Sequence, residues 1–120
     1  MATLTVPGSG SPFAVPLEVA DSPRARRRGL LGRDGVPGAL LLPRTSAVHT
    51  LGMRFAVDVA YLDRGSRVLA VRTMRPGRVG LPRFRARRVV EAEAGAMAAW
   101  GVRRGVRLVV DLDGPDRNGA

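Results

Sequence analysis

The sequence contains no cysteine, lysine, isoleucine or glutamine, and it has one histidine, one tryptophan and one tyrosine. The lack of cysteine excludes disulfide bonds, a thiolate nucleophile and cysteine-based zinc sites. A single histidine argues against a zinc or copper site built from side chains alone, so we expect no metal and no cofactor. No stretch approaches the roughly 20 apolar residues of a transmembrane helix. The opening residues, MATLTVPGSGSPF, also lack the charge and the apolar run of a signal peptide, which predicts a cytoplasmic protein without a membrane span.

The charge of the chain is strongly unbalanced. All 20 basic residues are arginine, against 10 acidic residues, and the net charge is +10. Arginine in place of lysine is typical of a bacterial GC-rich genome, but codon usage does not explain the excess of bases over acids. A basic surface attracts phosphates, nucleic acid or anionic lipid. Codon usage and a polyanionic partner therefore both stay open as explanations.

Length and composition predict one soluble domain. A chain of 120 residues with 45% hydrophobic and 25% charged residues is typical of a single globular domain. Glycine, proline and serine gather near the start, and the end of the chain is polar. We therefore expect a flexible N-terminus over 1–12, a single domain over 13–112 and a flexible tail over 113–120.

Short apolar segments between turn residues predict strands rather than long helices. Strands are expected at 13–20, where Pro16 indicates an edge position, and at 38–43, 55–62, 67–74, 88–95 and 106–112. Asp63–Ser66 predicts a hairpin turn, and two short helices are expected, one after Ser22 and one near Met97. The fold class is mainly β (α+β), a small and mostly antiparallel β-barrel or rolled sheet of about six or seven strands with two short helices.

Five segments in a fixed order resemble one known family, the domain of unknown function 192. They are LEVADSPRARRRGLLGR, ALLLP, VHTLGMRFAVDVAYLD, GRVGLP and VVEAEAGAMAAWGVRRGVRLVV, which together run from about Leu17 to Val110. The most specific pieces are Arg28–Arg33, the His49–Met53 segment with Asp58 five residues later, and Glu93–Gly95 followed by Trp100 and Gly101.

This resemblance implies a compact β-rich fold with short helices and no established activity. Many relatives are exported with an N-terminal signal, which this sequence lacks. Gly52 stands where relatives usually have a bulky side chain before the methionine. If that side chain lines a pocket in the relatives, the pocket here is wider or is filled from elsewhere.

His49 and Asp58 are the polar residues that most suggest a site. The imidazole can shuttle a proton or bind a ligand, or it can simply hydrogen-bond a backbone carbonyl in a turn. Asp58 lies within an apolar strand, where an unpaired charge is costly. It can therefore face a cleft, with Arg54 or Arg28 as partner, or accept backbone N–H groups that fix the preceding loop. Both interpretations stay open.

Three further patterns were weighed as sites. Glu91 and Glu93 share one face of a strand and could act as an acid/base pair, although a solvated face balanced by neighbouring arginines is the simpler interpretation. No Gly-x-Ser-x-Gly elbow and no lysine-containing phosphate loop is present. The segment 75–88 has six arginines and no acid, and it is expected to form a long basic loop that could hold phosphates and stack bases.

These patterns support three hypotheses about function. The first is a binding or accessory domain, without catalysis of its own, for a small anionic ligand or a partner peptide near Arg28, His49, Thr50, Met53, Arg54 and Asp58. The second is a nucleic-acid-binding module that uses Arg75, Arg78, Arg83, Phe84, Arg85, Arg87 and Arg88. The third is a hydrolase-like enzyme with His49 and Asp58 as an acid/base pair within hydrogen-bond reach.

Overall fold

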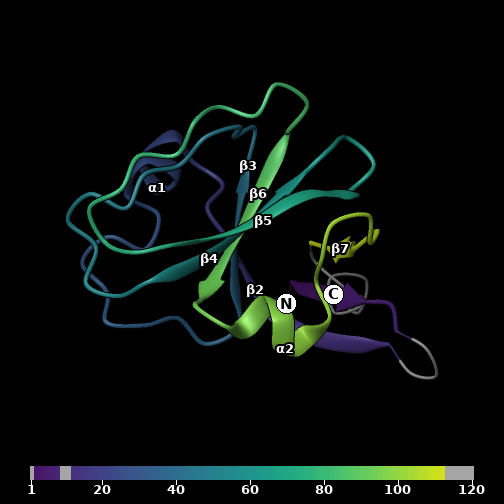
Figure 1. Ribbon diagram of the computed structural model, residues 1–120. Helices are drawn as coiled ribbons and strands as arrows, with labels where there is room; N and C mark the ends of the chain where they lie inside the picture. Colours follow the sequence, from purple (N-terminus) through teal and green to yellow (C-terminus); the bar gives the residue numbers. More distant parts are fainter. Residues whose placement is uncertain (1, 9–11, 113–120) are drawn as a thin grey trace, which may run out of the picture.

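The computed structural model describes residues 2–8 and 12–112 (Figure 1). These residues form seven strands and two short helices, which confirms the predicted mainly β class. The elements are β1 (Thr3–Val6), β2 (Phe13–Val19), α1 (Pro23–Arg28), β3 (Ala39–Pro43), β4 (Val57–Leu62), β5 (Val68–Met74), β6 (Arg88–Glu93), α2 (Ala96–Trp100) and β7 (Val109–Asp111). The expected tail over 113–120 lies outside the described residues.

All seven strands belong to one mixed, curled sheet in the order β5-β4-β6-β3-β2-β1-β7. The β2–β3 pair is parallel and every other pair is antiparallel, as the prediction of a mostly antiparallel sheet requires. The strands curl into a half-barrel, and Figure 1 shows α1 and α2 at separate places around the sheet. Neighbours in the sheet are thus far apart in the chain at β6–β3 and at β1–β7.

The central strands β3, β4 and β6 are buried on both faces, and each face of the sheet has its own apolar core. On one face, Leu30 from the segment after α1 packs with β3, β4 and β6 side chains such as Leu42, Val59 and Val89. On the other face, Met97 from α2 packs with side chains such as Val90. Because successive residues of a strand point to opposite faces, a central strand between two cores is buried along its whole length. All six residues of β4 are buried for this reason.

The predicted hairpin joins β4 and β5. Oδ1 of Asp63 accepts the backbone N–H groups of Gly65 and Arg67, each at 2.9 Å. Ser66 completes the turn with a positive φ of 67°. An aspartate that bonds the backbone ahead of it is a common way to close such a turn, so the local sequence fixes this register.

The start of α1 also follows its sequence signal. The Ser22 hydroxyl accepts the N–H of Ala25 at 3.0 Å, and Pro23 occupies the first turn. Gly29 ends the helix with a φ of 50°, a region that side chains rarely adopt. The residues at its two ends therefore determine where this short helix begins and ends. The arginines of the helix lie on a segment that covers one face of the sheet.

Two local predictions were wrong at the N-terminal end. Residues 3–6 were expected to be flexible, yet they form β1, which is paired on both sides by β2 and β7. Pro16 was expected to mark an edge, yet β2 lies between β1 and β3. Leu17 N–H donates to the Ala2 carbonyl at 3.1 Å, so Pro16 occupies a non-hydrogen-bonded position opposite Thr3. The missing N–H of Pro16 therefore removes no bond to β1.

Candidate functional site

A cavity of about 410 Å³ lies between α1, the segment 45–53 and one face of the sheet. Its volume falls within the range of small-molecule sites. The lining is chemically divided, with apolar side chains such as Leu31, Leu42 and Met53 and a polar group made of Arg26, Arg27, Arg28, His49 and Glu91. An amphipathic small molecule matches this mixture of surfaces.

Glu91 carries the unusual chemistry of the cavity. The register of β6 places it opposite Leu40 and Val59, on the face that α1 covers. Only 5% of the residue is exposed, and its carboxyl group has no hydrogen bond or ion pair among the described residues. A Cβ built on Gly29 would lie 3.5 Å from Glu91 Oε1, so the carboxyl group sits against the end of α1. Burial raises the pKa of Glu91 to about 7.

This burial corrects the simpler interpretation of the two glutamates as a solvated pair. Glu93 is exposed and accepts the N–H of Val36 at 3.0 Å, whereas Glu91 lies in the cavity. The acid stands in the middle of VVEAEA, on a strand that proves to be central in the sheet. An acid inside such an apolar strand was the available sequence signal for a buried carboxyl group. Whether the strand is central in the sheet, however, depends on its pairing with strands that are distant in the sequence.

Arg26 is the second polar group of the cavity without a partner. Its Nη1 is buried and has no hydrogen-bond partner within the described ranges. Arg27 and Arg28 line the same cavity and are exposed. A buried polar atom without a partner is costly in free energy. A ligand that accepts a hydrogen bond from Arg26 would remove this cost.

His49 and Met53, two of the ligand-binding candidates, line the cavity. The imidazole is exposed, and its Nδ1 accepts the N–H of Leu51 at 3.2 Å, while its backbone pairs with Val79. Half of the turn interpretation therefore applies, since the ring does bond the backbone, but to an N–H rather than to a carbonyl. The other ring nitrogen, Nε2, makes no such bond in the described part of the chain.

Gly52 lies at the rim of this region with a φ of 76°. A Cβ at this position would lie 3.0 Å from Cδ1 of Leu31, which itself lines the cavity. The space next to Gly52 is thus occupied by a side chain from the segment after α1.

Thr50 is fully buried and holds two loops together. Its hydroxyl donates to the Arg75 carbonyl at 2.6 Å and accepts the Arg78 N–H at 2.9 Å. Its own N–H donates to the Arg78 carbonyl at 2.7 Å, and its carbonyl accepts the N–H of Gly77 at 2.8 Å. These bonds fix the start of the basic loop against the wall of the cavity, so the hydroxyl of this ligand-binding candidate is already used.

Asp58 lies away from the cavity, beneath α2. Its Oδ1 accepts the Thr73 hydroxyl at 2.6 Å, and its Oδ2 accepts the N–H groups of Gly95 and Met97 at 2.9 and 3.1 Å. Asp58 pairs with Ala92 on β6, whereas Glu91 faces the opposite side of the sheet. The carboxylate thus fixes the start of α2, rather than the preceding loop.

Two predicted groupings are therefore not formed. His49 and Asp58 lie on opposite faces of the sheet and cannot act as a hydrogen-bonded acid/base pair. Arg54 forms an exposed ion pair with Asp34 at 3.2 Å and does not partner Asp58. Arg28 lines the cavity but makes no bond to Asp58.

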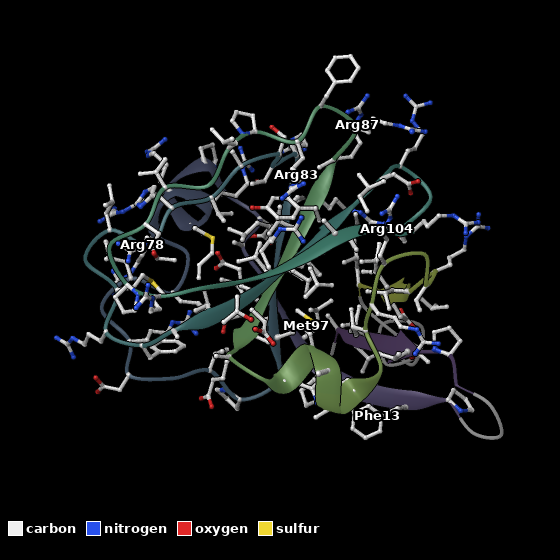
Figure 2. The ribbon with its side chains drawn as sticks, in the orientation of Figure 1. Phe13, Arg78, Arg83, Arg87, Met97 and Arg104 are labelled. Atoms are coloured by element: carbon white, nitrogen blue, oxygen red, sulfur yellow. The ribbon has the colours of Figure 1, made fainter. Side chains whose placement is uncertain are left out.

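The basic loop is ordered, and its arginines divide into two kinds. Arg75, Arg78, Arg85 and Arg87 are exposed, as is Phe84 at 94%. Arg83 instead stacks over the ring of Tyr61 at 4.8 Å, and Arg88 donates to the Ser66 hydroxyl. Figure 2 shows Arg83 turned in over the sheet and Arg87 at the periphery. Three of these exposed arginines, Arg75, Arg78 and Arg85, make no side-chain hydrogen bond in the described part of the chain. Nη1 of Arg87 donates to the carbonyls of Phe84 and Ala86, each at 3.2 Å, so this exposed arginine also holds the loop.

Within residues 2–8 and 12–112, no group of three or more histidine or acidic side chains is placed to hold a metal ion. The same ranges contain no helix that is long and apolar enough to span a bilayer.

Two solved structures share this fold. A protein of unknown function from Novosphingobium aromaticivorans aligns with a TM-score of 0.77 and 18% identity, over 89% of this chain and 83% of that one. A candidate transcription regulator from Sinorhizobium meliloti aligns with a TM-score of 0.69 and 18% identity, over 91% of this chain and 92% of that one. At this identity the likeness shows the fold alone.

Sequence comparison leads to a family. UPF0127 protein PH1112 of Pyrococcus horikoshii is 36% identical over 50 residues, which are 42% of this chain and 44% of that protein. The chain thus aligns with less than half of that relative. The profile of the family described as Uncharacterized ACR, DUF192, matches residues 4–110, which is nearly all of the described domain. The chain therefore belongs to the domain of unknown function 192 family.

Proposed function

We propose that the protein is a small binding domain, without catalysis of its own, that holds an amphipathic anion in the cavity beside α1. The observation that carries this proposal is one cavity that holds two polar groups without a partner among the described residues, the buried Nη1 of Arg26 and the carboxyl group of Glu91, a residue that is 5% exposed. Folded proteins satisfy most buried polar atoms. Two unpartnered groups on one cavity indicate a place where a ligand supplies the missing partners.

The charge of the lining favours an anion. Arg26, Arg27 and Arg28 come from one helix and all line the cavity, and a guanidinium binds carboxylate, sulfonate or phosphate through charge-assisted hydrogen bonds. Leu31, Leu42 and Met53 offer apolar surface for the remainder of such a ligand.

The test compares two arginines of α1 that differ in position alone. Arg26→Gln removes the guanidinium whose Nη1 is buried in the cavity, and Arg24→Gln removes an exposed guanidinium that lies outside it. Both changes lower the net charge by the same amount. Calorimetric titration with hexane-1-sulfonate should show at least tenfold weaker binding for Arg26→Gln, because a charge-assisted bond is worth about 1.5–3 kcal/mol. The affinity of Arg24→Gln should stay within about twofold of the unmodified protein.

If neither variant loses affinity, the proposal is contradicted, because the Arg26 guanidinium then contributes nothing to binding. If both variants lose affinity to the same extent, only the net charge of the protein matters, which contradicts the proposal as well. Both outcomes can be separated from misfolding by the thermal unfolding of each variant, since neither side chain makes a hydrogen bond in the described part of the chain.

A second candidate function rests on the basic loop. Arg75, Arg78, Arg85 and Arg87 are exposed on one ordered segment beside Phe84, and a cationic surface with an exposed aromatic ring suits single-stranded nucleic acid. Replacing these four arginines with glutamine should abolish RNA or DNA binding and flatten its dependence on salt.

The matched control for this loop replaces four exposed arginines that lie outside the segment 75–88 and do not line a hollow with Arg75, Arg78, Arg85 or Arg87; they are Arg24, Arg103, Arg104 and Arg107. Each set removes four charges, so net charge is the same in both variants. If the two sets weaken binding equally, attraction is non-specific and the loop is not a nucleic-acid site.

A further inference from the structure

The cavity beside α1 contains an acid that the arginines do not neutralise. Glu91 lines the same cavity as three arginines, yet no guanidinium lies within ion-pair distance of its carboxyl group. The carboxyl oxygens also receive no N–H or O–H group from the described residues. An ionised carboxylate at this position would repel an anionic ligand bound by the arginines, so the presence of an acid in this cavity needs an explanation.

The surroundings of Glu91 define its charge state. Leu40 and Val59 flank it on the neighbouring strands, and Gly29 approaches its Oε1. The charged or titratable groups on the elements around it are Arg26, Arg27 and Arg28 from α1, His49 from the segment 45–53 and Glu93 on its own strand. Burial is the cause that favours the neutral acid, and it brings the pKa to about 7.

We propose that Glu91 meets the bound anion as a neutral carboxylic acid and donates a hydrogen bond to it, so that anion binding is coupled to protonation of Glu91. This inference rests on the proposed function. It adds that a proton on Glu91 is needed for binding and that the site selects ligands by their charge. The neutral acid supplies an O–H donor, and Arg26 supplies an N–H donor on the same cavity. A single anionic headgroup accepts from both, which satisfies both unpartnered groups at once.

The coupling selects among ligands of one shape by their charge. A cation would pair with ionised Glu91 but would meet three arginines, so it should bind weakly. A neutral alcohol can bond either form of the acid and should bind independently of pH. An anion should bind more weakly as Glu91 ionises, because its apparent affinity is proportional to the fraction of Glu91 that remains protonated.

The experiment uses hexane-1-sulfonate, hexan-1-ol and hexylammonium, which share one apolar chain and keep their charge between about pH 5.5 and 8.5. Calorimetric titration should show the sulfonate bound about thirtyfold more weakly at the higher pH, because a group with a pKa of about 7 is then about 3% protonated. Glu91→Gln keeps a neutral donor of the same shape, so its affinity for the sulfonate should be the same at both pH values.

His49 requires its own control, because an imidazole ordinarily titrates in this range. His49→Asn retains a side-chain acceptor for the Leu51 N–H and removes the imidazole. The pH dependence should persist in His49→Asn and disappear in Glu91→Gln. The reverse result would overturn the inference and assign the coupling to the imidazole.

The remaining outcomes are equally distinct. Sulfonate binding that does not change with pH would overturn the coupling and leave the proposed function intact. Hexylammonium binding more tightly than the sulfonate at the higher pH would show that Glu91 is a carboxylate site for cations. No binding of any probe at either pH would overturn the proposed function, and the inference with it.

Discussion

The burial of Glu91 predicts that the stability of this protein depends on pH in a way that one substitution removes. The pKa of Glu91 rises from its ordinary value of 4.5 to about 7 in the folded protein because the carboxyl group is desolvated. Between these two values the unfolded chain releases its proton while the folded protein keeps it. The folded state then binds more protons, so stability falls as pH rises through this window and is lowest above it.

The size of the effect follows from the two pKa values. At about pH 5 the unfavourable contribution of Glu91 is about 1 kcal/mol, and at about pH 8.5 it reaches about 3–4 kcal/mol. Glu91→Gln removes this contribution and adds a constant cost for burying an amide without a partner, about 1–3 kcal/mol. The constant cost cancels when the two pH values are compared. The variant should therefore gain about 2–3 kcal/mol relative to the unmodified protein between about pH 5 and pH 8.5.

Urea denaturation of both proteins at the two pH values measures this difference directly. Glu18→Gln is the control, because the Arg33 hydrogen bond lowers the pKa of Glu18 and keeps its titration below this range. Its effect on stability should be the same at both pH values. A difference below about 1 kcal/mol for Glu91→Gln would refute the reasoning, since it would mean that water or a neighbouring group reaches the carboxylate.

Three further predictions follow from the hydrogen bonds of the site and its frame. Asp58→Ala should lower the unfolding free energy by about 2–4 kcal/mol, because the start of α2 loses its acceptor; a melting temperature within 2 °C or so of the unmodified protein would contradict this role. Thr50→Val should accelerate hydrogen exchange at Arg78, whose N–H loses its acceptor; unchanged exchange would show that the hydroxyl is dispensable. Arg33→Ala should cost below about 1 kcal/mol near neutral pH, because its ion pair with Glu18 is partly exposed, and this cost should vanish as pH falls through the lowered pKa of Glu18, because the carboxylate is then protonated.

Local structure could be predicted from the sequence because its causes lie within a few residues. The Asp63 turn uses an aspartate that bonds backbone groups two and four positions later. The start of α1 depends on Ser22 and on a proline directly after it. Alternating apolar residues also identified most strands, since one side of each strand must be buried. The mainly β class follows from these local signals together.

The candidate site could be predicted only in part. The ligand-binding candidates His49, Met53 and Arg28 line one cavity, but Asp58 does not belong to it. Glu91 was weighed as a solvated acid, yet it became the central group of the cavity. The sequence displays the residue types and their spacing, while the burial that gives an acid its chemistry is a property of neighbouring strands.

The sequence alone thus predicts most of the strands, their turns, the helix ends and an excess of positive charge. It does not predict which strands are central, which face α1 covers or which acid lies beneath that helix, because these depend on the tertiary structure. The backbone N–H groups that Asp58 accepts lie 37 and 39 residues later in the sequence, and β1 pairs with β7 from the other end of the domain. Such contacts depend on how all the elements of the domain pack together, which no short segment of sequence specifies. The same packing places Glu91 without a partner in a cavity lined by arginine.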